Sequence, residues 1–263
     1  MRKERGRVEA VESVDGELGD LRTAGTADGG TALSTTLVYI KIPDGTRYAR
    51  LKPHTYASSA TVAKVALCPY LTVLKTTDSG ATFTDYSANA QDASAATDVT
   101  LSSLDTLANG DWVYCGAHRK FAGIDVDVDA ANGTASVILV EYWDGHDWVD
   151  IADTDGTISA GATFAQDGDI TWTVPAAWAK SVLAGRNLYW LRISVSVALD
   201  SSTTQNHWIA IPESTARWEI PSGDDLRVSL FRDYQGWAFI EALTDTGTAK
   251  LIVNVATGPY EEF

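Results

Sequence analysis

The stretch Gly123-Ile124-Asp125-Val126-Asp127-Val128-Asp129 decides the fold class of this chain. Apolar and acidic residues alternate in it with a period of two. In an extended strand this period sends the aliphatic side chains to one face and the carboxylates to the other. Aspartate is a poor strand former because its short side chain competes for backbone hydrogen bonds. Three aspartates in register therefore predict a strand whose outer face is strongly solvated, binds a metal, or meets a basic partner.

The acidic character extends over residues 121–179. This fifth of the chain contains eleven Asp and Glu and no Lys or Arg, so it carries −11 of the formal net charge of −15. Such a balance argues against nucleic acid as the main partner, because affinity for phosphates comes from Lys and Arg. No apolar run approaches the ~18 residues that a membrane span needs, and the basic residues 1–7 lack the apolar region of a secretion signal. We expect a protein made in a cytoplasm, with no membrane partner.

The two cysteines, Cys68 and Cys115, each follow an apolar, strand-like run. We interpret them as buried free thiols rather than as a disulfide or metal ligands. Two distant Cys and four scattered His do not give the ligand spacing of a zinc site.

Short apolar segments separated by turn residues recur from residue 34 onward. Turns are indicated at Pro43-Asp44-Gly45 and at Asp144-Gly145. The one helical pattern is at residues 175–184, with Pro175 suited to the first position and Gly185 to the end. The sequence thus predicts an all-β chain with two β-sandwich or jelly-roll units, an extended N-terminal arm and one short helix.

The predicted domain layout has three parts. Residues 1–33 lack hydrophobic periodicity and are expected to form an extended arm that reaches neighbouring chains. Residues 34–92 plus 213–263 are expected to form one β-sandwich, and residues 93–212 an acidic jelly-roll inserted into it. The low-complexity residues 88–97 are interpreted as the linker. Two consecutive domains followed by a C-terminal hairpin is the competing layout.

Catalytic motifs are missing from the sequence. It contains no Gly-x-Ser-x-Gly elbow, no phosphate-binding loop and no dinucleotide fingerprint. A pair of glycosidase carboxylates has no distinct signature here, because a chain this acidic supplies carboxylate pairs by chance. We therefore expect a protein that is not an enzyme.

Calcium is the metal that the sequence favours, although no cofactor is required. Asp153-Thr154-Asp155-Gly156 and Gln166-Asp167-Gly168-Asp169 place carboxylates beside glycine, a setting that suits a hard cation. Asp153, Asp155, Asp167 and Asp169 are the candidate ligands. Neither run matches the twelve-residue calcium loop with its closing Glu, and turn formation alone also explains both.

Several tryptophans lie at positions where they would face outward. In residues 187–197 the alternation puts Trp190 and Arg192 on the face opposite Tyr189 and Leu191. The predicted glycan-binding residues are Trp143, Trp148, Trp190, Arg192 and Trp208, with Asp147 as a second polar clamp. Core packing or a subunit interface is the alternative, because Trp also anchors interfaces.

Four motifs together resemble a known module. They are Asp111-Trp112-Val113-Tyr114-Cys115-Gly116, Val140-Glu141-Tyr142-Trp143-Asp144-Gly145-His146-Asp147-Trp148, Thr171-Trp172-Thr173-Val174-Pro175 with Trp178, and Tyr189-Trp190-Leu191-Arg192-Ile193. The pattern is similar to a module of tailed-bacteriophage structural proteins and covers roughly residues 95–212. The resemblance implies a galactose-binding-like (discoidin-like) jelly-roll, and it brings no catalytic residues.

Together these observations predict a structural protein of a tailed-phage virion. It would be a capsid decoration, a head fibre, or a tail or baseplate component, located in the virion. Its partners would be copies of itself and other virion proteins. The main alternative is a carbohydrate-binding adhesin that recognises host-surface glycans, and a third option is a glycoside hydrolase or depolymerase.

Overall fold

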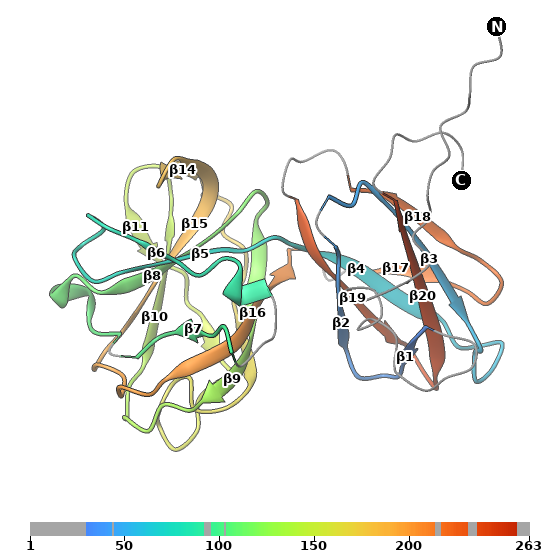
Figure 1. Cartoon of the computed structure of the whole chain (residues 1–263), viewed down its shortest axis with the longest axis horizontal. Helices are drawn as coiled ribbons and strands as arrows, with labels where there is room; N and C mark the ends of the chain where they lie inside the picture. The colour runs from blue at the N-terminus through green and yellow to red at the C-terminus, as the bar shows by residue number, and fades with distance from the viewer. Residues whose placement is uncertain are drawn as a thin grey trace, which may run out of the picture. The chain divides into compact units, whose positions relative to one another are not determined.

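The computed structural model describes residues 30–43, 45–91, 96–102, 104–213, 217–230 and 236–256 (Figure 1). These residues form twenty β-strands and two 3₁₀ helices of three residues each. Four sheets contain the strands, and the strand pairings whose register the described residues define are antiparallel. The predicted all-β class with sandwich packing is confirmed. Nearly all of the predicted N-terminal arm lies outside the described residues, although Thr31–Leu33 form strand β1.

The chain divides into two compact units. The first comprises residues 1–68 and 216–263, and the second comprises residues 69–215. Residues 69–91 were expected in the first sandwich, and this boundary was wrong. Strand β4 (Ala63–Pro69) pairs with β17 (Trp218–Ile220) in the first unit, whereas the next strand, β5 (Thr72–Thr76), pairs with β8 (Trp112–Ala117) in the second.

The first unit is a sandwich of two four-stranded sheets (Figure 1). One sheet runs in the order β1 (Thr31–Leu33), β20 (Ala249–Ala256), β3 (Tyr48–His54) and β18 (Leu226–Ser229). The other runs β17 (Trp218–Ile220), β4 (Ala63–Pro69), β19 (Trp237–Thr244) and β2 (Val38–Lys41). Aliphatic side chains from both sheets, among them Leu51, Leu251, Val65 and Ile240, pack into one buried cluster. Alternation along each strand produces this core, since every second side chain points inward.

The second unit is a larger sandwich with a seven-stranded and a five-stranded sheet. The seven-stranded sheet contains β11 (Trp148–Asp150), β10 (Ile138–Trp143), β15 (Arg186–Val195), β8 (Trp112–Ala117), β5 (Thr72–Thr76) and β6 (Thr84–Asp85) in this order, with β14 (Lys180–Leu183) also paired to β15. The five-stranded sheet runs β12 (Thr154–Asp155), β13 (Gly168–Thr171), β9 (Phe121–Ala130), β16 (Thr204–Pro212) and β7 (Val99–Thr100). The two 3₁₀ helices are η1 (Asn89–Gln91) and η2 (Leu107–Asn109).

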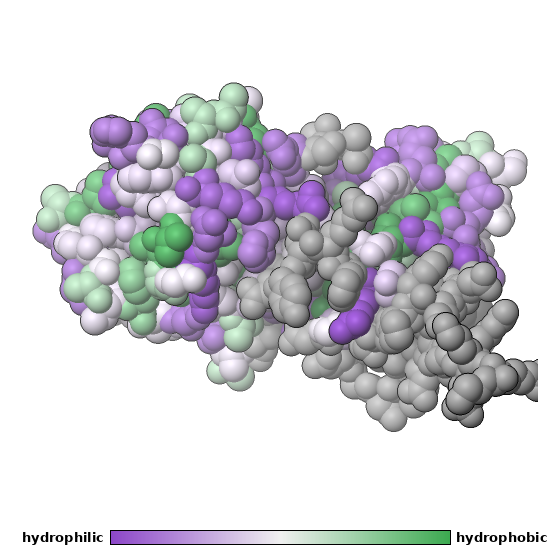
Figure 2. All heavy atoms as spheres, turned by 90° about the horizontal axis from the view of Figure 1, so that it is seen from above, coloured by the Kyte–Doolittle hydropathy of each residue, from purple (hydrophilic) through white to green (hydrophobic). Residues whose placement is uncertain are grey.

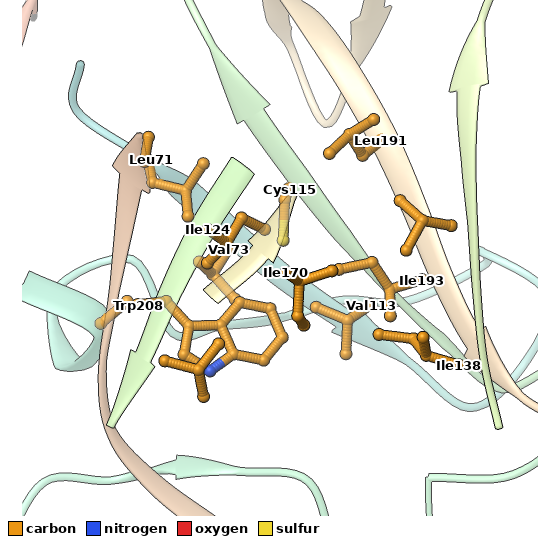
Figure 3. Close-up of a cluster of buried hydrophobic side chains, with 14 of the residues drawn as sticks. Leu71, Val73, Val113, Cys115, Ile124, Ile138, Ile170, Leu191, Ile193 and Trp208 are labelled. Carbon is orange, nitrogen blue, oxygen red and sulfur yellow. The ribbon is translucent and has the colours of Figure 1, made fainter. Parts of the chain in front are cut away.

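Side chains from both of these sheets meet in the core of the second unit. Figure 3 shows Val113, Leu191 and Ile193 of the seven-stranded sheet converging on Ile124 and Trp208 of the five-stranded sheet. Cys115 is fully buried in this cluster, and Cys68 is also buried. Both cysteines are free thiols, as expected, and burial raises the pKa of Cys115 well above its usual value.

Two local predictions were wrong. Residues 175–184 do not form a helix: Lys180–Leu183 is strand β14, and a hairpin joins it to β15. Ala184 and Gly185 both have positive φ, of 48° and 76°, which is the backbone of a tight type I′ hairpin turn. Residues 88–91, expected in a linker, belong to the second unit, where Ala90 is fully buried in the core as part of η1.

Candidate functional site

The outer face of the seven-stranded sheet carries a second apolar layer. Leu74, Trp112, Tyr114, Leu188 and Trp190 form a buried cluster separate from the sandwich core. Strand register explains why these residues meet, because Tyr114 lies opposite both Leu74 and Arg192 on neighbouring strands. Alternate side chains of each strand enter the core, so the remaining ones gather on this outer face. We call this the aromatic face.

Arg192 stands at the centre of the aromatic face. Its Nε and Nη2 atoms lie 2.8 and 2.6 Å from one carboxylate oxygen of Glu141, which is opposite it on β10. Both side chains are largely buried, with 14% and 13% exposed. The guanidinium also lies over the rings of Trp112 and Trp148, 5.4 and 5.0 Å from their centroids. A charged hydrogen-bonded pair and two cation–π contacts therefore hold this arginine in one position.

Trp143 and Trp148 form the solvent-facing part of the aromatic face. They pair across the β10–β11 hairpin with ring centroids 5.5 Å apart, and Trp148 is also 5.5 Å from Tyr114. Both tryptophans are partly exposed, whereas Trp112 and Tyr114 beneath them are nearly buried. Burial raises the pKa of the Tyr114 phenol above its usual value, so it remains neutral at physiological pH. The arrangement is a preformed aromatic surface with one buried ion pair under it.

Trp190 lies on this face, but it is not available to a ligand. Its side chain is 0% exposed, and its indole N–H donates to the carbonyl of Ser181 in β14 at 3.0 Å. The ring occupies the space beside Gly116, where an added Cβ would lie only 2.4 Å from it. The sequence correctly predicted that Trp190 and Leu191 point to opposite faces of the sheet. The expectation that Trp190 is exposed was wrong, because the β14 hairpin covers its side chain.

Trp208 belongs to a different part of the unit. It is 0% exposed in the core, on β16 of the five-stranded sheet, and its ring stacks on Phe164 with centroids 6.0 Å apart. Of the predicted glycan residues, the structure therefore brings together Trp143, Trp148 and Arg192, with Trp190 hidden beneath. Asp147 is exposed in the hairpin between Trp143 and Trp148, where it pairs with His146.

The candidate calcium ligands mostly bond to nearby groups of the chain. Both oxygens of Asp155 accept bonds from the hydroxyls of Thr157 and Thr163, and Asp167 accepts one from the backbone N–H of Val128. Burial and the neighbouring Asp155 and Asp150 raise the pKa of Asp153 to about 6. Among the described residues, no group of three or more His, Cys, Asp or Glu is placed to hold a metal ion. The structure therefore does not support a calcium centre here.

The alternating aspartates lie on the outer face of the five-stranded sheet. Ile124 and Val126 point into the core, while Asp125, Asp127 and Asp129 point away from it. Asp169 of β13 stands directly opposite Asp125. His207 of β16 places Nε2 3.1 Å from Asp125 and Nδ1 3.9 Å from Asp127. We call this outer surface, with Asp125, Asp127, Asp129 and Asp169, the acidic face. Strand β9 therefore has the predicted aliphatic inner face and acidic outer face.

Sequence reasoning missed the residues that organise the aromatic face, namely Trp112, Tyr114 and Glu141. A signal for them was present, because Glu141 alternates with Trp143 and Trp112 with Tyr114 on strands that flank β15. Their meeting depends on strand order, which the sequence does not state. Figure 2 shows that exposed apolar residues on the viewed face are scattered among hydrophilic ones, in agreement with isolated exposed residues such as Val137 and Val182.

Comparisons with protein-family models, with curated proteins and with solved structures found no match to this chain. In the part of the chain that the structure describes, no helix is long and apolar enough to cross a membrane.

Proposed function

We propose that this chain is a structural protein of a tailed-phage virion that acts through contacts with other subunits. The aromatic face carries the proposal. Trp143 and Trp148 are held in place by Tyr114 and by the Arg192–Glu141 pair before any partner binds. Rigid Trp and Arg side chains are the usual anchors of protein interfaces, and an ordered anchor loses little conformational entropy on binding. The phage-like motifs of residues 111–193 supply the class of partner.

The proposal is tested by the composition of purified particles. Mass spectrometry of virions from the phage that encodes the chain should find it as a stoichiometric component. Trp148→Ala should reduce its incorporation about tenfold or more, since a central interface tryptophan commonly contributes ~2 kcal/mol or more. Trp218→Ala, which changes an exposed tryptophan of the first unit, is the matched control and should incorporate normally. Absence of the wild-type chain from particles would refute the proposal.

A glycan-binding adhesin is the second candidate, and the same face favours it. Aromatic rings stack on sugar rings, and the exposed Asp147 and His146 beside Trp148 provide hydrogen-bonding groups. On a glycan array the chain should then bind a defined set of sugars, and Trp148→Ala should abolish the signal while Trp218→Ala retains it. No binding at millimolar sugar would count against this alternative.

A further inference from the structure

The exposed part of the aromatic face is surrounded by carboxylates. Residues 121–179 contain eleven Asp and Glu and no Lys or Arg, and all of these residues belong to the described part of the chain. The β10–β11 hairpin, which presents Trp143 and Trp148, carries four of the acidic groups. They are Glu141, Asp144, Asp147 and Asp150. This part of the surface is therefore acidic in the full sequence as well as in the structure.

Strand register places two of these carboxylates on the same side of the sheet as the tryptophans. Trp143 pairs with Trp148, and Glu141 pairs with Asp150, across the hairpin. Tyr142 packs against the sandwich core, so its two neighbours along β10 point outward. Two aromatic rings and two carboxylates thus share one outward surface.

Arg192 neutralises only one of these two outward carboxylates. Its guanidinium contacts Glu141, and in the described part of the chain Asp150 makes no ion pair. One oxygen of Asp150 accepts a hydrogen bond of 2.8 Å from the backbone N–H of Ala152. Like charges directly opposite each other on neighbouring strands destabilise a sheet, as Glu141 and Asp150 do here. A second cation beside Asp150 would offset this repulsion.

The turn of the hairpin adds two more carboxylates beside the rings. Asp144 accepts hydrogen bonds of 2.7 Å from the backbone N–H groups of Asp147 and His146, and these bonds lower its pKa. Asp147 pairs with His146, but these side chains are 74% and 89% exposed, so solvent screens the pair. After the charge of Arg192 is subtracted, the hairpin carboxylates leave a net charge of −3 while His146 is neutral.

The neighbouring strand β14 does not supply the missing cation. The backbone N–H of Ala179 donates to the carbonyl of Trp143 at 2.9 Å, so β14 begins beside this tryptophan. The lysine of β14, Lys180, pairs with Tyr189 and lies 5.1 Å from the centroid of its ring. Tyr189 packs against the sandwich core, so Lys180 points to the other side of the sheet. The exposed rings are therefore open to a cation from outside the chain.

Arg192 shows how a guanidinium binds to this surface. It lies over the rings of Trp112 and Trp148 while it bonds to Glu141. Guanidinium groups stack on aromatic rings because the ring face is electronegative. Trp143 is partly exposed, and it has no such contact with a cation of the described residues. The outer ring of the face thus lacks the partner that the inner rings have.

We infer that the aromatic face binds an exposed arginine of a partner subunit. The inference rests on the proposed function, since it states the chemistry of one subunit contact. The arginine would stack on Trp143, with Asp147 and Asp150 as its carboxylate partners. Arginine suits this surface better than lysine, because its planar group both stacks on rings and forms paired hydrogen bonds to carboxylates. A neutral sugar could stack on the rings but would not use the charge.

A short capped peptide that alternates arginine and glycine is the probe, and isothermal titration calorimetry with the full chain measures its binding. The matched peptide carries citrulline in place of arginine, which keeps the planar group but removes the charge. The arginine peptide should bind at least about tenfold more tightly, and added salt should weaken its binding. Equal binding of the two peptides would overturn the inference.

Variants of the chain locate the site. Asp147→Asn with Asp150→Asn removes two charges and keeps the side-chain size, and Trp143→Ala removes the outer ring. Each should weaken binding of the arginine peptide about fivefold or more. Asp129→Asn with Asp169→Asn removes two exposed charges from the acidic face of the other sheet and should bind as the wild type does. Circular dichroism confirms that each variant is folded. An equal loss in this control would mean attraction to acidic surface in general, and the inference would fail.

Sugars and virions separate this inference from the functions proposed above. Binding of neutral sugars that Asp147→Asn with Asp150→Asn leaves unchanged, without binding of the arginine peptide, would overturn the inference in favour of the glycan adhesin. If the wild-type chain is found in virions but the arginine peptide does not bind, the proposed function stands and only this partner chemistry fails. If the peptide binds as expected but virions lack the chain, the arginine site stands and the virion function fails.

Discussion

The two units share an architecture but fill it differently. The fifteen buried residues in the core cluster of the first unit are all aliphatic, whereas the main cluster of the second contains Phe121, Phe164, Trp172, Trp178 and Trp208. The second unit also has an outer apolar layer on its seven-stranded sheet. Aliphatic side chains need no polar partners, but each buried indole needs an acceptor for its N–H. Trp172 and Trp178 find theirs in the backbone carbonyls of Phe121 and Trp190, whereas the buried indole N–H of Trp208 has no hydrogen-bond partner among the described residues.

This difference indicates where each unit is vulnerable. The second unit depends on a few large aromatic side chains that connect strands on both faces of one sheet. The first unit depends on many small contacts, and its least favourable feature is a buried charge, Glu241 of β19, which is 2% exposed. The predictions below are arranged to test this contrast, from the largest expected effect to the smallest.

Trp190→Ala should be the most damaging of these changes. It empties the space between Gly116 and the β14 hairpin and removes the hydrogen bond to Ser181. Truncation of a fully buried tryptophan typically lowers the free energy of unfolding by about 3–5 kcal/mol. Denaturant unfolding followed by tryptophan fluorescence should show the transition of the second unit at lower denaturant. Trp218→Ala in the first unit should change its transition by less than about 1 kcal/mol, and equal losses would contradict the contrast.

Arg217→Ala should destabilise the first unit in a pH-dependent way. Arg217 Nε lies 2.7 Å from Glu241 Oε1, and without it a buried carboxylate loses its partner. Burial raises the pKa of Glu241, an effect that Arg217 opposes, so in the variant this pKa rises further. The free energy of unfolding should fall by about 3 kcal/mol near neutral pH. The loss should shrink as pH falls and Glu241 takes up a proton, because neutral Glu241 needs no cation.

Thermal unfolding of this variant from pH 4 to pH 8 measures the effect. Lys64→Ala is the control, because its pair with Glu219 is largely solvent-exposed and should contribute no more than about 1 kcal/mol. A loss of equal size at both ends of the pH range would show that Arg217 acts through packing rather than through its charge.

The sequence was most informative where a single strand decides the outcome. The alternation in residues 123–129 predicted both the buried aliphatic face and the outward aspartates of β9, and the Asp144-Gly145 turn predicted the β10–β11 hairpin. The sequence was less informative where the order of strands in a sheet, or burial by another element, decides whether a side chain is exposed. Trp190 alternates as an exposed residue does, but the outer apolar cluster and the β14 hairpin together bury it. Pro175 and Gly185 are typical of helix ends. In the structure, however, Ala184 and Gly185 both have positive φ and form the two-residue turn of a hairpin.

Asp153→Asn is expected to stabilise the second unit slightly. The folded unit raises the pKa of Asp153 to about 6 through burial and the nearby Asp155 and Asp150. Between the ordinary pKa of an aspartate, near 4, and this raised value, the folded state holds a proton that the unfolded chain has released. Stability therefore falls as pH rises through this window and stays lower above it. An asparagine has no charge to bury, so the variant avoids this loss.

Because Asp153 is only partly buried, solvent screening should reduce the gain to about 1 kcal/mol at pH 8, and the gain should disappear toward pH 4. Denaturant unfolding at several pH values measures it, with the exposed Asp147→Asn as the matched control. A gain that does not vary with pH would mean that the amide forms a new hydrogen bond. A loss at pH 8 would instead mean that the Asp153 carboxylate stabilises the fold as an ion, in which case the turn around it is a more favourable site for a cation than the geometry indicates.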